Sequence, residues 1–246
     1  MTSLQLQLSS NNADSRNDDS FIYYLPPEAI TAESQEHIYI SVQSAILPNT
    51  FYNINAYNNI LCYALTSNLI KTYLIFPKGN YTIKDIVNYI NSNMLNFTVS
   101  YNKTYNKLTF QNLSNSNFIF YPESTIYNVI GFKNGLIYNS SNGLLESVSA
   151  VNINSIQYIN IKVNINTQNI TKYNVNDRNI ICSIPVNVNP YGIITYKNEN
   201  NFRINTFKSD LTEIILSFTD QNGNNIDFNG VQWSLVFQID IINFVV

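Results

Sequence analysis

The sequence predicts a mainly β fold, a single jelly-roll β-sandwich that carries an α+β insertion. Three observations indicate this: apolar and polar residues alternate in short runs, turn residues separate the runs, and one amphipathic helix lies in a segment of different texture. Alternation with a period of two is typical of half-buried strands, because successive side chains of a strand point to opposite faces. Eight such runs outside the insertion match the strand number of a jelly roll.

The N-terminal third predicts an arm followed by strands. Residues 1–20 are polar and rich in Asn, Ser and Asp, which favours an extended arm. Ile38, Ile40 and Val42 share one face of the clearest strand, and prolines end that strand and the one before it because proline cannot donate to a central ladder. The strands of this region are predicted at 21–26, 37–48 and 59–65.

The insertion is predicted over residues 69–134, which leaves 21–68 and 135–246 for the jelly roll. Its main element is a helix from Thr82 to about Met94, where Thr82 and Asp85 have the spacing of a capping box. A second, short helix is predicted to end at Gly131, where glycine suits a C-cap. Short strands are predicted between these helices at 97–101, 107–110 and 118–121.

The C-terminal part is predicted to return to strands, which lie at 159–165, 180–188, 192–197, 211–219 and 231–243. The last two are long alternating runs around Asn222-Gly223, the strongest short-range signal for a β-hairpin. We therefore predict a closing antiparallel hairpin. In its second strand Trp233 lies on the apolar face, and Asp240 lies on the polar one. The apolar final residues predict a C-terminus docked in the fold or in a partner.

The composition excludes several classes of function. Charged residues make up only 12% of the chain, and the asparagine excess, spread through periodic segments, is attributed to an AT-rich genome. A net charge of −3 with scattered Lys and Arg argues against a specific nucleic-acid partner. No run reaches the roughly 18 apolar residues of a membrane span. The N-terminus lacks the features of a signal peptide, so we expect the protein to stay in the cytosol of the cell that makes it.

The sequence predicts no enzyme, with no catalytic, cofactor or metal site. His37 is the single histidine and lies on the polar face of its strand. Cys62 and Cys182 fit no zinc motif and are interpreted as buried free thiols; whether they lie close in space is left open. Asp220 and Asp227 resemble a calcium loop only superficially, because glycine and glutamate miss the EF-hand positions. We interpret both aspartates as turn residues.

Several stretches resemble the minor capsid, or penton, proteins of virophages and related Polinton-like double-stranded DNA viruses. The most distinctive is the closing segment TDQNGNNIDFNGVQWSLVFQIDI, with Asp220, Gly223, Ile226-Asp227-Phe228, Gly230 and Trp233 at the spacing of that family. The other matching stretches are LSSNNADSRNDDSFIYYLPPEAI, SVQSAILPNTFYNINAYNN, FPKGNYTIKDIVNYIN and IYNVIGF.

The resemblance implies a structural virion protein that forms homopentamers at the fivefold vertices of an icosahedral capsid, assembled in the host cytoplasm. Its partners would be further copies of itself, capsomers of the major capsid protein and other minor capsid proteins, with residues 1–20 contacting a neighbour. Two alternatives remain open. A cement subunit would lie between capsomers. A carbohydrate-binding jelly roll would act in host attachment through the insertion, with Trp233 and tyrosines as a sugar platform, although an isolated Trp in an alternating strand is more often a core residue.

Overall fold

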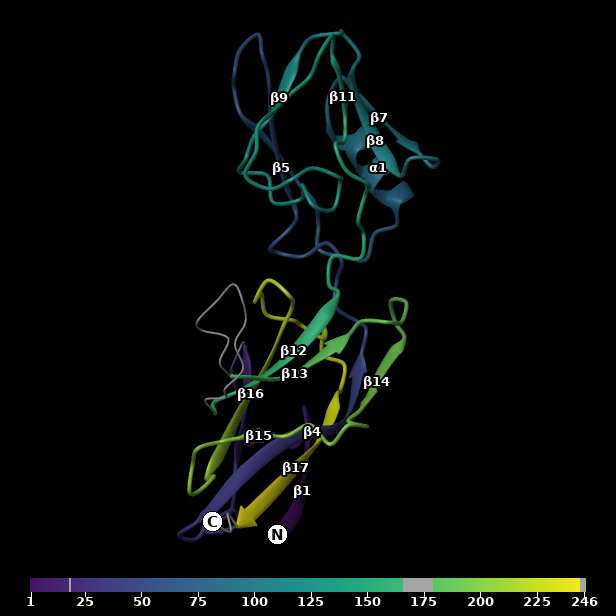
Figure 1. Cartoon of the computed structure of the whole chain (residues 1–246). Coiled ribbons are helices and arrows are strands. Elements are labelled where there is room, and N and C mark those ends of the chain that lie inside the picture. The colour runs from purple at the N-terminus through teal and green to yellow at the C-terminus, as the bar shows by residue number, and fades with distance from the viewer. Residues whose placement is uncertain (18, 166–178, 244–246) are drawn as a thin grey trace. The chain divides into compact units, whose positions relative to one another are not determined.

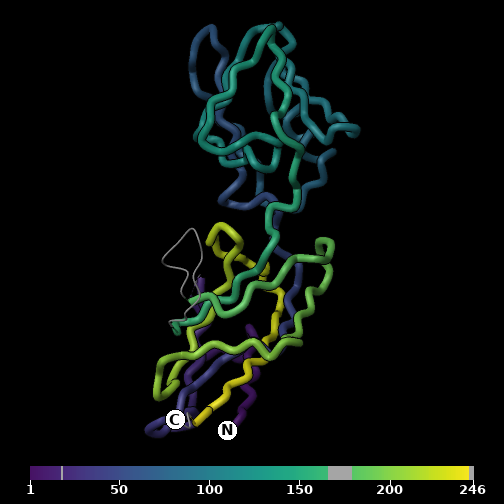
Figure 2. Tube along the Cα trace, in the orientation of Figure 1, coloured from purple at the N-terminus to yellow at the C-terminus, as the bar shows by residue number. Residues whose placement is uncertain are grey.

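The computed structural model describes residues 1–17, 19–165 and 179–243 and divides the chain into two compact units. The first unit comprises Met1–Phe51 and Ile156–Val246, and the second comprises Tyr52–Ser155. Figure 2 follows the chain out of the first unit and back into it. The insertion is therefore longer than the predicted 69–134, because the strand predicted at 59–65 pairs within the second unit and not with the jelly roll.

The first unit is a jelly roll of two antiparallel sheets, as predicted (Figure 1). In sheet order, the first sheet contains β1 (Thr2–Ser9), β17 (Ser234–Asn243), β4 (Glu36–Pro48) and β14 (Ile193–Lys197), and β15 (Ile204–Asn205) also pairs with β4. The second sheet contains β13 (Ile180–Pro185), β12 (Tyr158–Val163), β16 (Glu213–Thr219), β3 (Ser20–Tyr24) and β2 (Ser15–Asn17). The second unit is inserted between β4 and β12.

Residues 1–20 do not form an arm outside the fold, which corrects the prediction. Residues 2–9 form β1, which pairs along its whole length with β17, and residues 15–17 form β2. Residues 2–9 form a strand because apolar and polar residues alternate there, with Leu4, Leu6 and Leu8 on one face. The polar residues that surround these leucines make the alternation hard to recognise in the sequence. Leu8 is fully buried in the core. Deleting this segment would therefore remove an edge strand of the sandwich.

The predicted closing hairpin is also wrong, because β16 and β17 belong to different sheets. Asn225 bridges back to Thr219, and the chain then crosses to the other sheet. Gly223 has the positive φ expected of a turn residue, at 83°. Alternation shows that both segments are strands, but it does not specify the sheet that each one joins.

Aromatic side chains fill the core of the first unit close to this crossing. Trp233 is 2% exposed, and its ring lies 4.8 Å from the ring of Phe21 and 4.8 Å from that of Phe218, in edge-to-face geometry. Phe228 packs on Phe218 from the crossing segment at 5.1 Å. Edge-to-face pairs add to the stabilisation that burial gives. The crossing segment is thus held by the core.

The second unit contains two antiparallel sheets and one helix (Figure 1). In sheet order, one sheet contains β10 (Tyr138–Asn139), β9 (Phe118–Phe120), β5 (Ile60–Leu65) and β6 (Thr72–Ile75). The other contains β11 (Leu144–Glu146), β8 (Lys107–Asn112) and β7 (Phe97–Asn102). A separate core unites this unit, and its aromatic centre includes Phe110, Phe118, Phe120, Tyr127 and Phe132.

The helix α1 spans Ile83–Asn93 and confirms the predicted capping box. The Thr82 hydroxyl accepts from the backbone N–H of Asp85, and the Asp85 carboxylate accepts from the N–H of Thr82. The short helix predicted before Gly131 does not form, and successive turns take its place. Ile126 and Ile130 of this segment are nevertheless fully buried in the core of the second unit.

Candidate assembly surfaces

Asparagine side chains cover the open edges of two strands. At the outer edge of β1, Asn12 accepts from the N–H of Ser9 at 2.7 Å and donates to the carbonyl of Gln7 at 3.2 Å. At the edge of β7, Asn91 of α1 accepts from the N–H of Val99 at 2.6 Å and donates to its carbonyl at 3.1 Å. Open strand edges invite pairing with another chain. These amides occupy the backbone groups of Gln7, Ser9 and Val99 that such pairing would otherwise use.

We expect Asn91→Ala to expose the edge of β7. The Val99 amide should exchange with solvent faster, and the free energy of unfolding of the second unit should fall by about 1–2 kcal/mol, because two backbone groups lose a partner. Hydrogen-exchange mass spectrometry measures the first effect. Asn93→Ala is the matched control, because the Asn93 amide donates only to the Tyr89 carbonyl within the same helix. Equal exchange of Val99 in both variants would contradict the capping role.

Asp240 is buried on the outer face of the first sheet, where it is 3% exposed. Its carboxylate accepts from the Ser3 hydroxyl at 2.6 Å, the Gln238 amide at 3.0 Å and the Arg203 guanidinium at 3.3 Å. Arg203 in turn lies over the ring of Tyr39, with 5.3 Å to its centroid. The cluster therefore ties β1, β17 and the segment before β15 together.

This cluster makes stability dependent on pH. Burial alone raises the pKa of Asp240, but hydrogen bonds from Ser3, Gln238 and Arg203, with the charge of Arg203, lower it below its usual value. A lowered pKa in the folded state stabilises the protein above the unfolded pKa of about 3.9, and this contribution is lost as pH falls through the folded value.

We therefore expect Asp240→Asn to lower the free energy of unfolding at pH 7 and to have a smaller effect near pH 3. Urea unfolding at both pH values measures the difference, and Asp19→Asn, at an exposed position, is the control. An effect of Asp240→Asn that is independent of pH would show that its charge contributes nothing.

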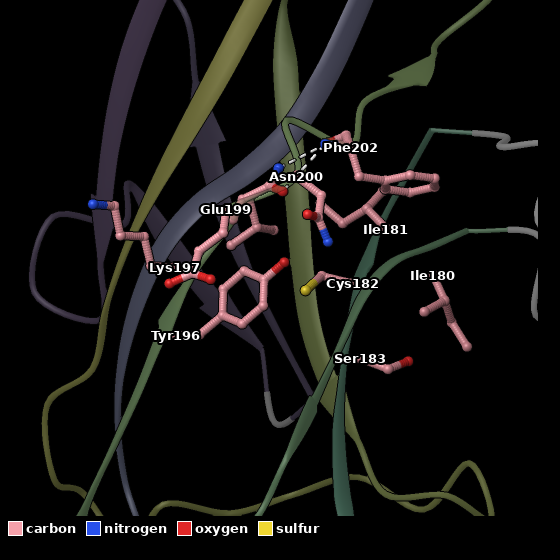
Figure 3. Close-up of a pocket in the computed structure, with 11 residues that line it drawn as sticks. Ile180, Ile181, Cys182, Ser183, Tyr196, Lys197, Glu199, Asn200 and Phe202 are labelled. Atoms are coloured by element: carbon pink, nitrogen blue, oxygen red, sulfur yellow. Dashed lines mark hydrogen bonds between the residues drawn. The ribbon is translucent and has the colours of Figure 1, made fainter.

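A cavity of about 370 Å³ lies at the side of the sandwich where β13 and β14 form the edges of the two sheets. Tyr196 of β14 and Cys182 of β13 point toward one another in it (Figure 3). Burial, together with a hydrogen bond to Cys182, raises the pKa of Tyr196 to about 12. Ile181 and Phe202 also line the cavity, together with polar and charged residues such as Lys197 and Glu199, so its walls are of mixed character.

The residues that the sequence singles out for chemistry are dispersed over the two units. His37 lies on β4, and Cys62 and Cys182 lie in different units. Cys62 is buried as predicted, whereas Cys182 is half-buried. Asp220 is a turn residue, as predicted, because its carboxylate accepts from the backbone N–H groups of residues 222 and 224. Asp227 likewise accepts from the N–H of residue 229.

The described residues show neither a metal-binding cluster nor a membrane-spanning helix. Within residues 1–17, 19–165 and 179–243, no three His, Cys, Asp or Glu side chains gather closely enough to hold a metal ion. The part of the chain that the structure describes contains no helix with the length and apolarity needed to cross a membrane. Trp233 is a core residue, as its place on the apolar face of an alternating strand predicts, and it is therefore unavailable as an exposed sugar platform.

The cluster around Asp240 and the cavity beside Tyr196 were not predicted from sequence. The sequence offers one indication of the cluster, since Asp240 is an acidic residue inside a long apolar strand. The partners of Asp240 come from distant segments and cannot be recognised in the sequence. For the cavity there was no signal, since it depends on which strands end each sheet.

Comparison with known proteins identifies the fold. No protein-family model and no curated protein matches the chain at a significant level. Among solved structures, the chain is similar to the penton protein of mavirus, with a TM-score of 0.50 and 12% sequence identity. The match covers 98% of this chain and 100% of that one, so both the jelly roll and the insertion take part. The resemblance seen in the sequence is thus confirmed in three dimensions: this chain has the fold of a virophage penton protein.

Proposed function

We propose that the protein is a structural, non-enzymatic capsid subunit that forms homopentamers at the fivefold vertices of an icosahedral virion. The observation that carries the proposal is the similarity to the mavirus penton protein over nearly the whole of both chains. Its partners would be its own copies, the surrounding major capsid protein capsomers and other minor capsid proteins. Assembly would take place in the host cytoplasm.

The surface chemistry supports this role. Only 12% of the residues are charged, so subunits can approach one another with little electrostatic cost, through hydrogen bonds and aromatic contacts. Exposed tyrosines suited to such contacts include Tyr24, Tyr158 and Tyr191 in the first unit. A ring of identical subunits requires a head-to-tail interface whose rotation closes.

Native mass spectrometry of the purified protein tests the proposal. We expect a species of five chains, each of 28.2 kDa. A protein that stays monomeric at all concentrations and binds glycans on an array would contradict the penton role and favour the carbohydrate-binding alternative. Trp233 is buried, so exposed tyrosines would have to form the sugar platform of that alternative.

A further inference from the structure

We propose that β14 of one copy pairs with β1 of the next copy, so that neighbouring jelly rolls share one continuous antiparallel sheet. This inference rests on the proposed self-assembly and specifies the segments that form its interface. The two strands have unpaired outward backbone groups, opposite directions and side chains that pairing would bring together.

The outer edge of β14 presents unpaired backbone groups. On the side of β4, Asn49 donates to the Gly192 carbonyl at 2.9 Å, and the N–H of Asn198 donates to the Gln43 carbonyl at 2.9 Å. Antiparallel pairs alternate, so the residues with even numbers between these two bond to β4. The N–H and C=O groups of Ile193, Thr195 and Lys197 therefore point away from the sheet, and all three residues are exposed.

Side chains or irregularities interrupt several other strand edges in the described part of the chain, whereas neither interrupts the outer edge of β14. Asn12 covers the second half of β1 and Asn91 covers β7, as described above, and the Asp14 carboxylate accepts from the N–H of Tyr24 at the end of β3, beyond its pairing with β2. A register irregularity and Pro185 interrupt β13. Natural sheets use such devices against unwanted pairing. Within residues 1–17, 19–165 and 179–243, no side chain bonds to the outward backbone groups of β14.

The first half of β1 presents a matching open edge. The N–H of Ser10 donates to the Trp233 carbonyl, which fixes the alternation, so Ser3 and Gln5 direct their backbone groups outward. Asn12 covers the same edge only at Gln7 and Ser9. The uncovered stretch, residues 2–6, has the same length as the five-residue β14.

The two strands lie at opposite edges of the same sheet and run in opposite directions. The order is β1-β17-β4-β14, and every neighbouring pair is antiparallel. Placing a second copy beside the first therefore brings β14 next to an antiparallel β1. Because the two edges differ, the contact is head-to-tail, which is the type of interface that generates rings.

Side chains on the inner faces of the two strands are complementary. Leu4 of β1 is 36% exposed and Leu6 is only partly buried, although both lie on the strand face that is directed to the core. At the other edge of the sheet, the inner face of β14 borders the cavity beside Tyr196, Ile181 and Phe202. Pairing of the strands would direct Leu4 of one copy toward Ile181 and Phe202, the apolar part of its neighbour's cavity, and remove these apolar side chains from water.

Proline substitutions test the pairing. Thr195→Pro and Gln5→Pro each remove an outward N–H, which an edge strand can lose without breaking its own ladder. We expect each variant to be a monomer by native mass spectrometry at a concentration where the wild type is a ring. Thr195→Ser and Gln5→Ser, which keep the N–H, should form the same ring as the wild type.

Mixing the two proline variants is the sharper experiment. Thr195→Pro keeps an intact β1 edge, and Gln5→Pro keeps an intact β14 edge. One competent pair of edges therefore remains in the mixture, and we expect a heterodimer and no larger ring. Proline variants that melt like the wild type and still form its ring would overturn the inference while leaving the proposed function intact. A wild type that never assembles would instead overturn the proposed function and this inference together.

Hydrogen exchange of the wild-type protein covers the case in which a proline variant does not fold. On assembly, the amides of Thr195 and Gln5 should exchange more than about tenfold slower, because outward groups that are free in the monomer become hydrogen-bonded. The amide of Tyr105, in an exposed turn of the second unit, is the internal control and should not change. A ring in which the amides of Thr195 and Gln5 exchange as fast as in the monomer would overturn the inference.

Discussion

Trp233→Ala is expected to lower the free energy of unfolding of the jelly-roll unit by about 3–5 kcal/mol. Trp233 is 2% exposed and contacts the rings of Phe21 and Phe218, so its removal leaves a large cavity at the crossing between the two sheets. Because the second unit has its own core, its unfolding transition should not move. Denaturant unfolding followed by hydrogen-exchange mass spectrometry resolves the two units.

Trp233→Phe is the matched variant. It keeps an aromatic ring in the core and loses only part of the volume. It also removes Nε1, a buried donor with no hydrogen-bond partner among the described residues, so no hydrogen bond is lost with it. We expect the Phe variant to retain most of the stability that the Ala variant loses. Equal losses in the two variants would contradict the account of ring packing at this position.

The second large effect is expected for Gly131→Ala in the inserted unit. Gly131 has φ of +84°, and an added Cβ would lie 2.4 Å from the backbone carbonyl oxygen of Ser149. The left-handed backbone costs an L-residue about 1–2 kcal/mol, and overpacking of a fixed neighbour costs about 1–3 kcal/mol more. Thermal unfolding should show the second unit melting earlier, with the jelly roll unaffected.

Gly135→Ala separates these two causes. Gly135 has a similar φ of +77°, but an added Cβ would meet no atom within 4 Å. We expect it to show only the backbone cost of about 1–2 kcal/mol. If both alanine variants lost the same amount, the close approach of residue 131 to Ser149 would carry no energetic weight.

Local patterns in the sequence predicted local structure well. The alternation around Ile38, Ile40 and Val42 predicted a strand, which is β4 in the structure. The spacing of Thr82 and Asp85 predicted the capping box of α1, which also forms. These features depend on contacts between residues close in sequence or on a strong apolar period.

The features that were missed depend on distant segments. β1 pairs with β17 across more than two hundred residues, and Ser3 reaches Asp240 only because of that pairing. The separation of β16 from β17 likewise depends on the sheet that each strand joins. The edge cap by Asn91 requires α1 to lie beside β7, which a single asparagine among many does not reveal. The assembly surfaces are therefore visible only in the folded chain.

The position of this chain in a density map of the intact particle tests the central claim most directly. We predict five copies around each fivefold vertex, each showing a jelly roll with an inserted α+β unit. Density for this fold between capsomers, away from the vertices, would indicate a cement protein and contradict the penton assignment.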